Sequence, residues 1–413
     1  MENIIVQKYG GTSVGSVDKV KAVAKKIVNR KREGNHIIVI VSAMGNTTNN
    51  LIKKANQINS NPSSREMDML LSTGEQISIS LLAMAIETLK EKVVSLTGQQ
   101  CGIITDCNHK KAKIEKIDNE RIIRELKENK IVIVAGFQGV NRNMDITTLG
   151  RGGSDTTAVA IAAAVKAKKC EIYTDVDGVY TADPRFVPNA QLLDKISYDE
   201  MLELASLGAK VLHPRSVELA RKFNIPLAVR SSFNDSKGTE IVEVNKVEKV
   251  LVRGISIDNE IVKIAVLEVP DKPGIAFKLF STLAKNNIHV DMIIQNINRK
   301  SINDITFTVN NDDLKEALRI ANEIASEIGA KSVIYDENVS KLSVVGTGIA
   351  GNSEVASTFF ESLYDLKINI QMISTSEIKI SCIIDKDGSL NAFQYLHDKF
   401  RLGNNIDTIN EAI

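Results

Sequence analysis

The 413-residue sequence lacks an excess of charge of either sign. Its formal net charge is +1 and 25% of its residues are charged, so nothing favours binding to nucleic acid or to an anionic membrane. It also lacks an apolar run near the roughly 20 residues needed to cross a bilayer. The start, MENIIVQKYGG, leads into a strand without a signal sequence. We therefore expect a cytoplasmic protein that acts on small molecules.

Cysteine is scarce, and its positions exclude the usual zinc motifs. The four cysteines, Cys101, Cys107, Cys170 and Cys382, include no close metal-binding pair, and the five histidines are equally scattered. We expect reduced structural thiols and no metal ion held by the protein alone. The length predicts two or three domains rather than one core.

Short β-branched runs alternate with helical patterns through the first half of the sequence. IIVQKY, HIIVIVS and IVIVAGF are such runs, and VDKVKAVAKKIVNRK has helical spacing. This alternation predicts an α/β fold with a mainly parallel sheet between helices. Ligands bind at the carboxyl ends of such strands. Polar, glycine-bearing loops follow three of them, at 8–13, 42–48 and 136–139, so they are expected to surround one cleft.

A glycine-rich segment at 147–157, TTLGRGGSDTT, precedes the small apolar run AVAIAAAVKA. Glycines let the backbone approach an oxyanion, and the first free N–H groups of a helix point toward it. Arg151 can hold a carboxylate or phosphate through two parallel hydrogen bonds, and Asp155 can anchor donors or a metal ion. A turn in which Ser154 or Asp155 only caps the helix is the alternative. Taken alone, the segment leaves both interpretations open.

Lys8 stands at the end of an apolar strand, just before Gly10 and Gly11. Exposed amides in this loop and the following helix could bind phosphates, and the lysine would supply a cation to a transferring group. The loop is not of the Walker type, because its lysine precedes the glycines. A tight turn with a solvated lysine is the alternative.

Five motifs occur in order along the chain: KYGGTSV, VSAMGNTTNNL, LSTGEQIS, TTLGRGGSDTTA and YTDVDGVYTADPR. With this order and spacing, the chain resembles aspartate kinases of the amino acid kinase family over essentially its whole length. The resemblance implies a carbamate-kinase-like catalytic domain. It also implies transfer of a phosphoryl group from ATP to the side-chain carboxylate of L-aspartate, the first step toward lysine, threonine and methionine.

The implied chemistry agrees with the residues present. A carboxylate nucleophile is already ionised at neutral pH, so catalysis requires positioning and charge neutralisation rather than a general base. By the resemblance, Lys8 would neutralise the transferring phosphoryl group and Asp155 would organise Lys8. Magnesium should arrive with ATP rather than occupy a cage built by the protein.

The resemblance also implies two sets of binding residues. Those expected to bind aspartate are Ser42, Thr47, Glu75, Arg151 and Ser154. Thr48 is the rival of Thr47, and Glu75 could instead be a favourable charge in a first helical turn. Those expected to bind the nucleotide are Lys8, Tyr9, Gly10, Gly11, Thr174, Asp175, Tyr180, Arg185 and Lys210. Lys210 could instead be a solvated lysine at a helix end.

A turn and a polar stretch separate the first half from a new domain. We predict a catalytic domain at 1–233, a linker at 234–249 and a regulatory region at 250–413. The regulatory region contains an internal repeat, in which Phe280 and Phe360 and five further apolar pairs lie 80 positions apart. Each repeat has the strand and helix order of a ferredoxin-like βαββαβ unit.

The first repeat, about 261–338, contains all its strands, whereas the second, about 341–413, is one strand short. The spare strand at 250–257 is expected to complete the second repeat, so that the first is inserted within it. Paired units of this kind resemble ACT modules, which bind amino acids. A purely structural dimerisation domain is the alternative.

The turn at Asp271-Lys272-Pro273-Gly274-Ile275-Ala276 could expose amides to a ligand carboxylate, which the corresponding turn of the second repeat is less suited to do. By the resemblance, an effector site for lysine or threonine is expected there. Its residues are Asp271, Gly274, Ile275, Ala276, Asp291, Gln295 and Asn296. Edge strands in these modules also favour a homodimer or a dimer of dimers.

Two other functions remain compatible with the sequence. A kinase of the same fold could phosphorylate another small acid. The chain could also be an amino-acid-binding sensor with an inactive kinase domain, although Lys8, Arg151 and Asp155 favour a working enzyme.

Overall fold

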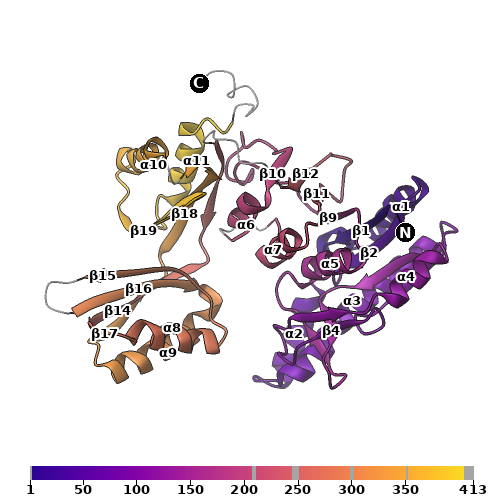
Figure 1. Ribbon diagram of the computed structural model, residues 1–413, viewed down its shortest axis with the longest axis horizontal. Coiled ribbons are helices and arrows are strands. Elements are labelled where there is room, and N and C mark those ends of the chain that lie inside the picture. Colours follow the sequence, from indigo (N-terminus) through magenta and orange to yellow (C-terminus); the bar gives the residue numbers. More distant parts are fainter. Residues whose placement is uncertain (1, 207–210, 244–250, 298–301, 350–351, 404–413) are drawn as a thin grey trace. The chain divides into compact units, whose positions relative to one another are not determined.

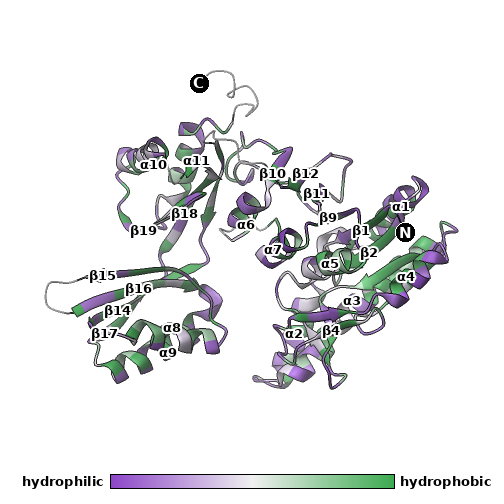
Figure 2. Ribbon diagram, in the orientation of Figure 1, coloured by the Kyte–Doolittle hydropathy of each residue, from purple (hydrophilic) through white to green (hydrophobic). Residues whose placement is uncertain are grey.

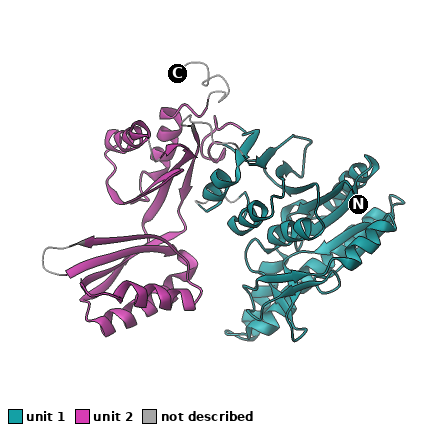
Figure 3. Ribbon diagram, in the orientation of Figure 1, with its two compact units in different colours: residues 1–180, 192–206, 210–245 teal, residues 181–191, 207–209, 246–413 magenta. Residues whose placement is uncertain are grey.

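The computed structural model describes residues 2–206, 211–243, 251–297, 302–349 and 352–403. They divide into two compact units, coloured separately in Figure 3. The first unit comprises residues 1–180, 192–206 and 210–245, and the second comprises 181–191, 207–209 and 246–413.

A mainly parallel eight-stranded sheet forms the centre of the first unit (Figure 1), in the order β10-β12-β11-β9-β1-β2-β6-β3. Its strands are β1 (Ile4–Tyr9), β2 (His36–Val41), β3 (Val93–Leu96), β6 (Ile131–Ala135), β9 (Lys169–Thr174), β10 (Lys195–Ser197), β11 (Leu227–Ser231) and β12 (Thr239–Val242). β1 lies between β2 and β9, and both pairings are parallel. The strand order therefore reverses at β1, and ligands in such sheets bind at the carboxyl ends beside this point.

Helices cover this sheet because its strands are apolar on both faces. Figure 2 shows β1 and β2 as mostly hydrophobic. α1 (Val17–Arg32) and α3 (Ser64–Glu87) share a buried cluster with alternate strand residues such as Ile5, Ile37 and Ile133. α5 (Gly153–Ala164) packs on β1, β2 and β9. The remaining helices of the unit are α2 (Thr47–Ile58), α4 (Glu120–Lys127), α6 (Tyr198–Ser206) and α7 (Pro214–Lys222), with a short 3-10 turn at Gly11–Val14.

A second, small sheet lies between β3 and α5 in the chain. Its order is β5-β4-β7-β8, with β4 (Ile103–Thr105), β5 (Ile114–Ile117), β7 (Gln138–Val140) and β8 (Ile146–Thr148). β8 leads directly into the glycine-rich loop at 149–153 and then into α5. This sheet therefore fixes one end of that loop.

Helix α3 is, by length and composition, apolar enough to cross a membrane, although no apolar segment of this kind is expected from the sequence. A core helix passes the same test, and α3 packs on α1, β3 and β6. Its buried side also carries Asp68, Ser72 and Glu75. These contacts make α3 a core helix of the first unit.

The second unit contains two antiparallel four-stranded sheets. The first has the order β15-β16-β14-β17 and the second the order β13-β18-β20-β19. Their strands are β13 (Leu251–Asp258), β14 (Ile261–Pro270), β15 (Val290–Ile297), β16 (Ile302–Asn310), β17 (Ser332–Asp336), β18 (Val339–Thr347), β19 (Ile370–Ser376) and β20 (Lys379–Asp385). The helices are α8 (Ile275–Lys285), α9 (Leu314–Ile328), α10 (Ser353–Asp365) and α11 (Ser389–Lys399), with a 3-10 turn at Asn311–Asp313.

β13 precedes the first repeat in the chain but pairs with a strand of the second. It runs antiparallel to β18, with Ile255 opposite Val344. Both residues lie in the apolar cluster of the second repeat. The first repeat is thus inserted between β13 and β18.

Two features contradict the predicted boundaries. The predicted linker at 234–249 contains β12, whose buried Thr239 and Ile241 alternate with half-buried residues and extend the large sheet. In addition, the segment 181–191 lies within the predicted catalytic domain but packs in the second unit, where Ala182 and Val187 join its apolar cluster. The polar turn before β12 resembled a linker, and nothing local marks 181–191 as part of another core.

Candidate active site

The loops after β1 and β2 pack tightly against each other. Gly45 N donates to Gly11 O at 3.0 Å. A Cβ on Gly11 would lie 2.7 Å from the carbonyl oxygen of Ala43, so only glycine permits this approach. The contact brings the two strand-end loops to one place beside β1.

Lys8 and Asp155 form an ion pair at this place. Lys8 Nζ lies 2.7 Å from Asp155 Oδ1, and both side chains are largely buried. The ammonium also lies 3.5 Å from where a Cβ on Gly10 would stand. Asp155 is in the first turn of α5, where a negative charge is favourable. Lys8 and Asp155, the catalytic pair predicted from the sequence, are therefore in contact beside Gly10.

The loop before α5 presents Arg151 between two glycines with left-handed backbone. Gly150 has φ +76° and Gly152 has φ +66°, and Arg151 between them is exposed. Ser154 is buried, and its Oγ lies 2.7 Å from where a Cβ on Gly136 would stand. The loop after β6 thus meets the start of α5 through another glycine.

Glu75 lies on the buried side of α3. Its Oε1 accepts a hydrogen bond from Ala43 N at 3.1 Å, whereas its buried Oε2 has no hydrogen-bond partner within the described residues. Burial raises the pKa of Glu75 to about 7, and the hydrogen bond from Ala43 opposes part of this rise. A Cβ on Gly74 would lie 2.8 Å from Ala43 Cβ, so this glycine lets the loop approach the helix.

Ser42 and Thr47 lie on the same loop as Ala43. Ser42 N donates to Tyr9 O at 3.1 Å, and Thr47 Oγ1 donates to Met44 O at 2.6 Å. Thr47 is the first residue of α2, and both it and Thr48 are half-buried. Thr47 and Thr48 thus begin α2 side by side, directly after the loop that contacts Glu75.

The predicted nucleotide loop follows β9. Thr174 Oγ1 donates to Asp175 Oδ1 at 3.1 Å, and Tyr180 OH donates to Asp177 Oδ2 at 3.4 Å. Burial and the nearby Asp177 raise the pKa of Tyr180. Asn234 Nδ2 donates to Asp177 Oδ1 at 2.7 Å, so the loop between β11 and β12 braces this segment.

Three of the residues predicted to bind the nucleotide are Tyr9, Arg185 and Lys210. The ring of Tyr9 is fully buried and stacks on Tyr173 at 4.6 Å, so only its main chain can reach a nucleotide. Arg185 lies in the second unit and its guanidinium pairs with Asp183. Lys210 lies outside the described residues.

Sequence reasoning missed two buried polar residues next to this site. Asp68 Oδ1 accepts from Thr148 Oγ1 at 2.6 Å, and Asp68 Oδ2 lies 2.7 Å from His109 Nδ1. Gln138 Nε2 donates to Ser72 O at 2.9 Å. Asp68, Ser72 and Glu75 follow helical spacing, and that pattern could have placed them on one face of α3.

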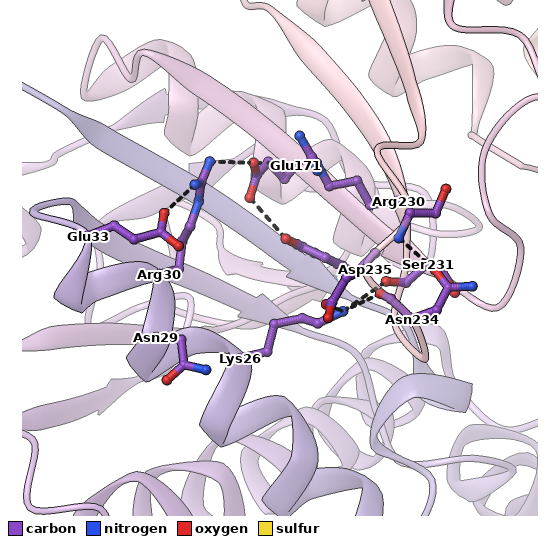
Figure 4. Close-up of a pocket in the computed structure, with 11 residues that line it drawn as sticks. Lys26, Asn29, Arg30, Glu33, Glu171, Arg230, Ser231, Asn234 and Asp235 are labelled. Atoms are coloured by element: carbon purple, nitrogen blue, oxygen red, sulfur yellow. Dashed lines mark hydrogen bonds and ion pairs between the residues drawn. The ribbon is translucent and has the colours of Figure 1, made fainter.

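A cavity of about 420 Å³ lies elsewhere in the first unit, among α1, β9 and β11 (Figure 4). Buried Glu171 in its wall accepts hydrogen bonds from Gln7 and Tyr173 and pairs with Arg30. Arg230 Nε lies 3.6 Å from Glu171. The charged groups of the wall mainly neutralise one another, which is typical of a structural network.

The predicted effector residues surround the start of α8 and β15. Gly274 has φ +94° and is the N-cap of α8, which Ile275 and Ala276 begin. Asp271 Oδ1 accepts from Asn303 Nδ2 at 3.1 Å. The other predicted residues, Asp291, Gln295 and Asn296, are exposed on β15.

Asp291 already has a partner within the second unit. Its carboxylate pairs with the ammonium of Lys341, which is 2% exposed. A ligand ammonium at Asp291 would therefore compete with Lys341. Among the described residues, no group of three or more His, Cys, Asp or Glu side chains is placed to hold a metal ion.

Two family models and a curated relative match this chain over most of its length. The model of the amino acid kinase family matches residues 3–231, and the model of the ACT domain matches 264–324 and 342–400. The aspartate kinase of Stutzerimonas stutzeri strain A1501 is 50% identical, over 97% of each chain.

Two solved structures share the fold. E. coli aspartokinase III in complex with aspartate and ADP (R-state) superposes with a TM-score of 0.83 at 24% identity, over 96% of this chain and 99% of that one. The same enzyme in complex with lysine and aspartate (T-state) gives 0.72 at 24% identity, with the same coverage. Together with the family matches and the half-identical relative, these findings place this chain in the amino acid kinase family, among the aspartate kinases with two ACT domains.

Proposed function

We propose that Lys8, Asp155, Arg151 and Glu75 carry out the ATP-dependent phosphorylation of L-aspartate in this enzyme. The observation that supports this most directly is the largely buried Lys8–Asp155 pair, 2.7 Å apart, at the strand where the sheet order reverses. A cation in this position lies where phosphates bind in open α/β sheets. In this proposal, Arg151 and Glu75 then need only to hold the side-chain carboxylate of aspartate in line with the phosphoryl group that is transferred.

The reaction needs no general base on the protein. The attacking group is the side-chain carboxylate of aspartate, which is ionised at neutral pH. Asp155 therefore acts by holding the ammonium of Lys8, which offsets the charge that develops on the transferring phosphoryl oxygens. The amides of Gly10 and Gly11 follow Lys8 in the same loop and are proposed to bind the same oxygens, although Gly10 N donates to Tyr173 O at 3.4 Å in the structure.

Aspartate brings two carboxylates and one ammonium to the site. In this proposal, Arg151 binds a carboxylate through its planar guanidinium. The buried Oε2 of Glu75, which has no hydrogen-bond partner among the described residues, would accept from the substrate ammonium. Ser42, Thr47 and Ser154 supply the neutral contacts.

ATP is proposed to lie over the loops after β1 and β9, with Thr174, Asp175 and Tyr180 at the nucleoside. Magnesium is proposed to arrive with the nucleotide, because its preferred ligands are oxygens and it keeps several waters. Bound to the phosphates, it would offset part of their charge.

Feedback control by lysine, threonine or both is proposed to use the ACT domains. The left-handed Gly274 opens the first turn of α8 toward a ligand carboxylate, and Asp271 lies beside it. The effector need only bind the inactive state more tightly, by about 1–3 kcal/mol of coupling. We further propose a cytoplasmic homodimer or dimer of dimers, built through the edge strands of the ACT sheets.

The test is a turnover assay with Mg-ATP and L-aspartate, in which hydroxylamine traps the acyl phosphate and ADP release is followed. Trapped product that decreases with lysine or threonine supports both halves of the proposal. ADP release only with another acid would change the substrate. Tight amino-acid binding without turnover would leave only the sensor function.

A matched pair of lysine variants tests the role of the catalytic pair. Lys8→Ala should lose turnover by about a hundredfold or more, the usual effect of removing one transition-state stabiliser. Lys21→Ala removes an exposed lysine of α1 and should leave turnover unchanged. Equal activity in the two variants would remove Lys8 from the mechanism.

A further inference from the structure

We propose that His213 and Arg215, at the start of α7, are positioning residues for aspartate binding. They hold the loop at 149–153, which presents Arg151, in one conformation. This inference rests on the proposed role of Arg151 in binding a carboxylate of aspartate. Neither residue reaches the substrate in this proposal, because each acts through the backbone of the loop.

Arg215 ties the loop to its neighbour. Its Nη1 donates to Leu149 O at 3.0 Å, and its Nη2 donates to Ala112 O at 2.9 Å. Ala112 N in turn donates to Thr148 O at 3.0 Å. One planar guanidinium therefore bridges two segments, with a fixed spacing between its donors that a lysine ammonium does not reproduce.

His213 holds the other side of the same loop. A Cβ on Gly152 would lie 2.1 Å from His213 Cγ, so the imidazole occupies the space where a side chain would project. Gly152 also has φ +66°, which glycine adopts without strain. Arg151 is thus between Leu149, held by Arg215, and Gly152, held against His213.

The ring is suited to this task in its neutral form. His213 is the N-cap of α7, and its Nδ1 accepts from Arg215 N at 3.3 Å, so a neutral ring carries its proton on Nε2. Burial lowers the pKa of His213, Arg215 and Arg151 lower it further, and only Asp155 raises it. A protonated ring could not accept the capping bond and would add a cation to a helix N-terminus.

These contacts matter because Arg151 is exposed and lies in a loop of glycines. Without support, the loop would sample several backbone conformations, and binding aspartate would have to select one of them. Small misplacements of a substrate-holding group weaken function far more than stability. The effect should therefore appear in the KM for aspartate, while the KM for ATP stays near its wild-type value.

The test compares variants that separate the ring from the cap. His213→Asn keeps a capping oxygen but removes the ring from Gly152, and should raise the KM for aspartate about tenfold or more with little change in kcat. His213→Phe keeps a ring against Gly152 and should recover most of the affinity. Arg215→Ala should resemble His213→Asn. Arg221→Ala, on the same helix but exposed, is the matched control and should match wild type.

Arg151→Ala, measured in parallel, separates this inference from the site proposal on which it rests. If Arg151→Ala leaves the KM for aspartate unchanged, the role of Arg151 is wrong and this inference falls with it. If Arg151→Ala raises that KM while His213→Asn and Arg215→Ala do not, only this inference is overturned. Arg215→Lys serves if Arg215→Ala does not fold, and it should lie between wild type and His213→Asn.

Discussion

Glu75 gives the sharpest prediction, because burial disfavours its charged form and the proposed site would give that charge a partner in the ammonium of aspartate. One oxygen accepts from Ala43 N, the other is buried without a partner in the described part of the chain, and burial raises the pKa to about 7. Below that pH, the free enzyme holds Glu75 mostly protonated and unable to attract an ammonium. The kcat/KM for aspartate should therefore fall about tenfold for each pH unit below 7.

Glu75→Gln tests the same reasoning at constant pH. The amide keeps an oxygen for Ala43 N but loses the charge that would bind the ammonium. A hydrogen bond to a charged group contributes about 1.5–3 kcal/mol, so the KM for aspartate should rise about ten- to a hundredfold at pH 8. In Glu75→Gln, the fall of kcat/KM for aspartate below pH 7 should also disappear, because the group that titrates there has been removed.

The folded state of the unliganded enzyme should show the opposite trend. A carboxyl group whose pKa rises from 4.5 to about 7 on folding binds more protons when folded, so stability falls as pH increases through this window. The full shift corresponds to at most about 3 kcal/mol. Glu75→Gln should therefore be more stable than wild type at pH 8, measured by urea unfolding without aspartate.

The assay is initial-rate kinetics between pH 5.5 and 8.5 with saturating Mg-ATP. The kcat/KM for ATP serves as the control, since ATP titrates in the same range. A flat profile for aspartate in the wild-type enzyme, together with a wild-type KM in Glu75→Gln, would refute the assignment.

Three further predictions follow from single contacts. Lys8→Asn removes the cation of the Lys8–Asp155 pair and should lose turnover about a hundredfold in the hydroxylamine assay; wild-type turnover would contradict it. Gly74→Ala would place a Cβ 2.8 Å from Ala43 Cβ, so it should lower the free energy of unfolding by about 1–3 kcal/mol and raise the KM for aspartate. An unchanged stability and KM would mean that the loop containing Ala43 can shift without cost. His397 lies 2.9 Å from Thr181 Oγ1, and burial lowers the pKa of its imidazole. Because the unfolded chain then binds a proton at higher pH than the folded protein does, the free energy of unfolding should fall below pH 6.5, by at most about 1.4 kcal/mol per pH unit. His397→Gln should remove this pH dependence from the free energies measured by urea unfolding.

Much of the fold was predictable because its patterns are local. Apolar runs with helical segments between them predict a parallel sheet, and polar loops at strand ends predict where ligands gather. The contact between Lys8 and Asp155 could not be derived from spacing, because 147 positions separate them and only the packing of α5 on β1 brings them together. The family resemblance supplied that pairing.

Other features depend on contacts that the sequence does not announce. β12 follows a polar turn typical of a linker, yet its alternating Thr239 and Ile241 complete a sheet edge. The segment 181–191 reads as a surface loop, but Thr181 and Ala182 are buried among residues of the second ACT repeat. Asp68 was missed because a single acidic residue on an apolar helix is expected to face solvent. Its burial depends on the hydrogen bond from Thr148, which is 80 positions away in the chain. In each case, the deciding partner is distant in the chain.

The two halves of the active site differ in how complete they are before substrates arrive. Lys8 pairs with Asp155 at 2.7 Å, so the half of the site proposed to face the phosphates is charge-balanced by the protein itself. Glu75 has a buried oxygen without a partner among the described residues, and in the proposed site the ammonium of aspartate would supply that partner. In the proposed site, aspartate binding would favour the ionised form of Glu75, whereas ATP binding would only redirect an existing ion pair. As the pH is lowered, aspartate binding should therefore weaken before ATP binding does. At neutral pH, the ammonium of bound aspartate should offset the free-energy cost of the buried Glu75 carboxylate. Glu75 would thus link substrate binding to stability in a way that Lys8 does not.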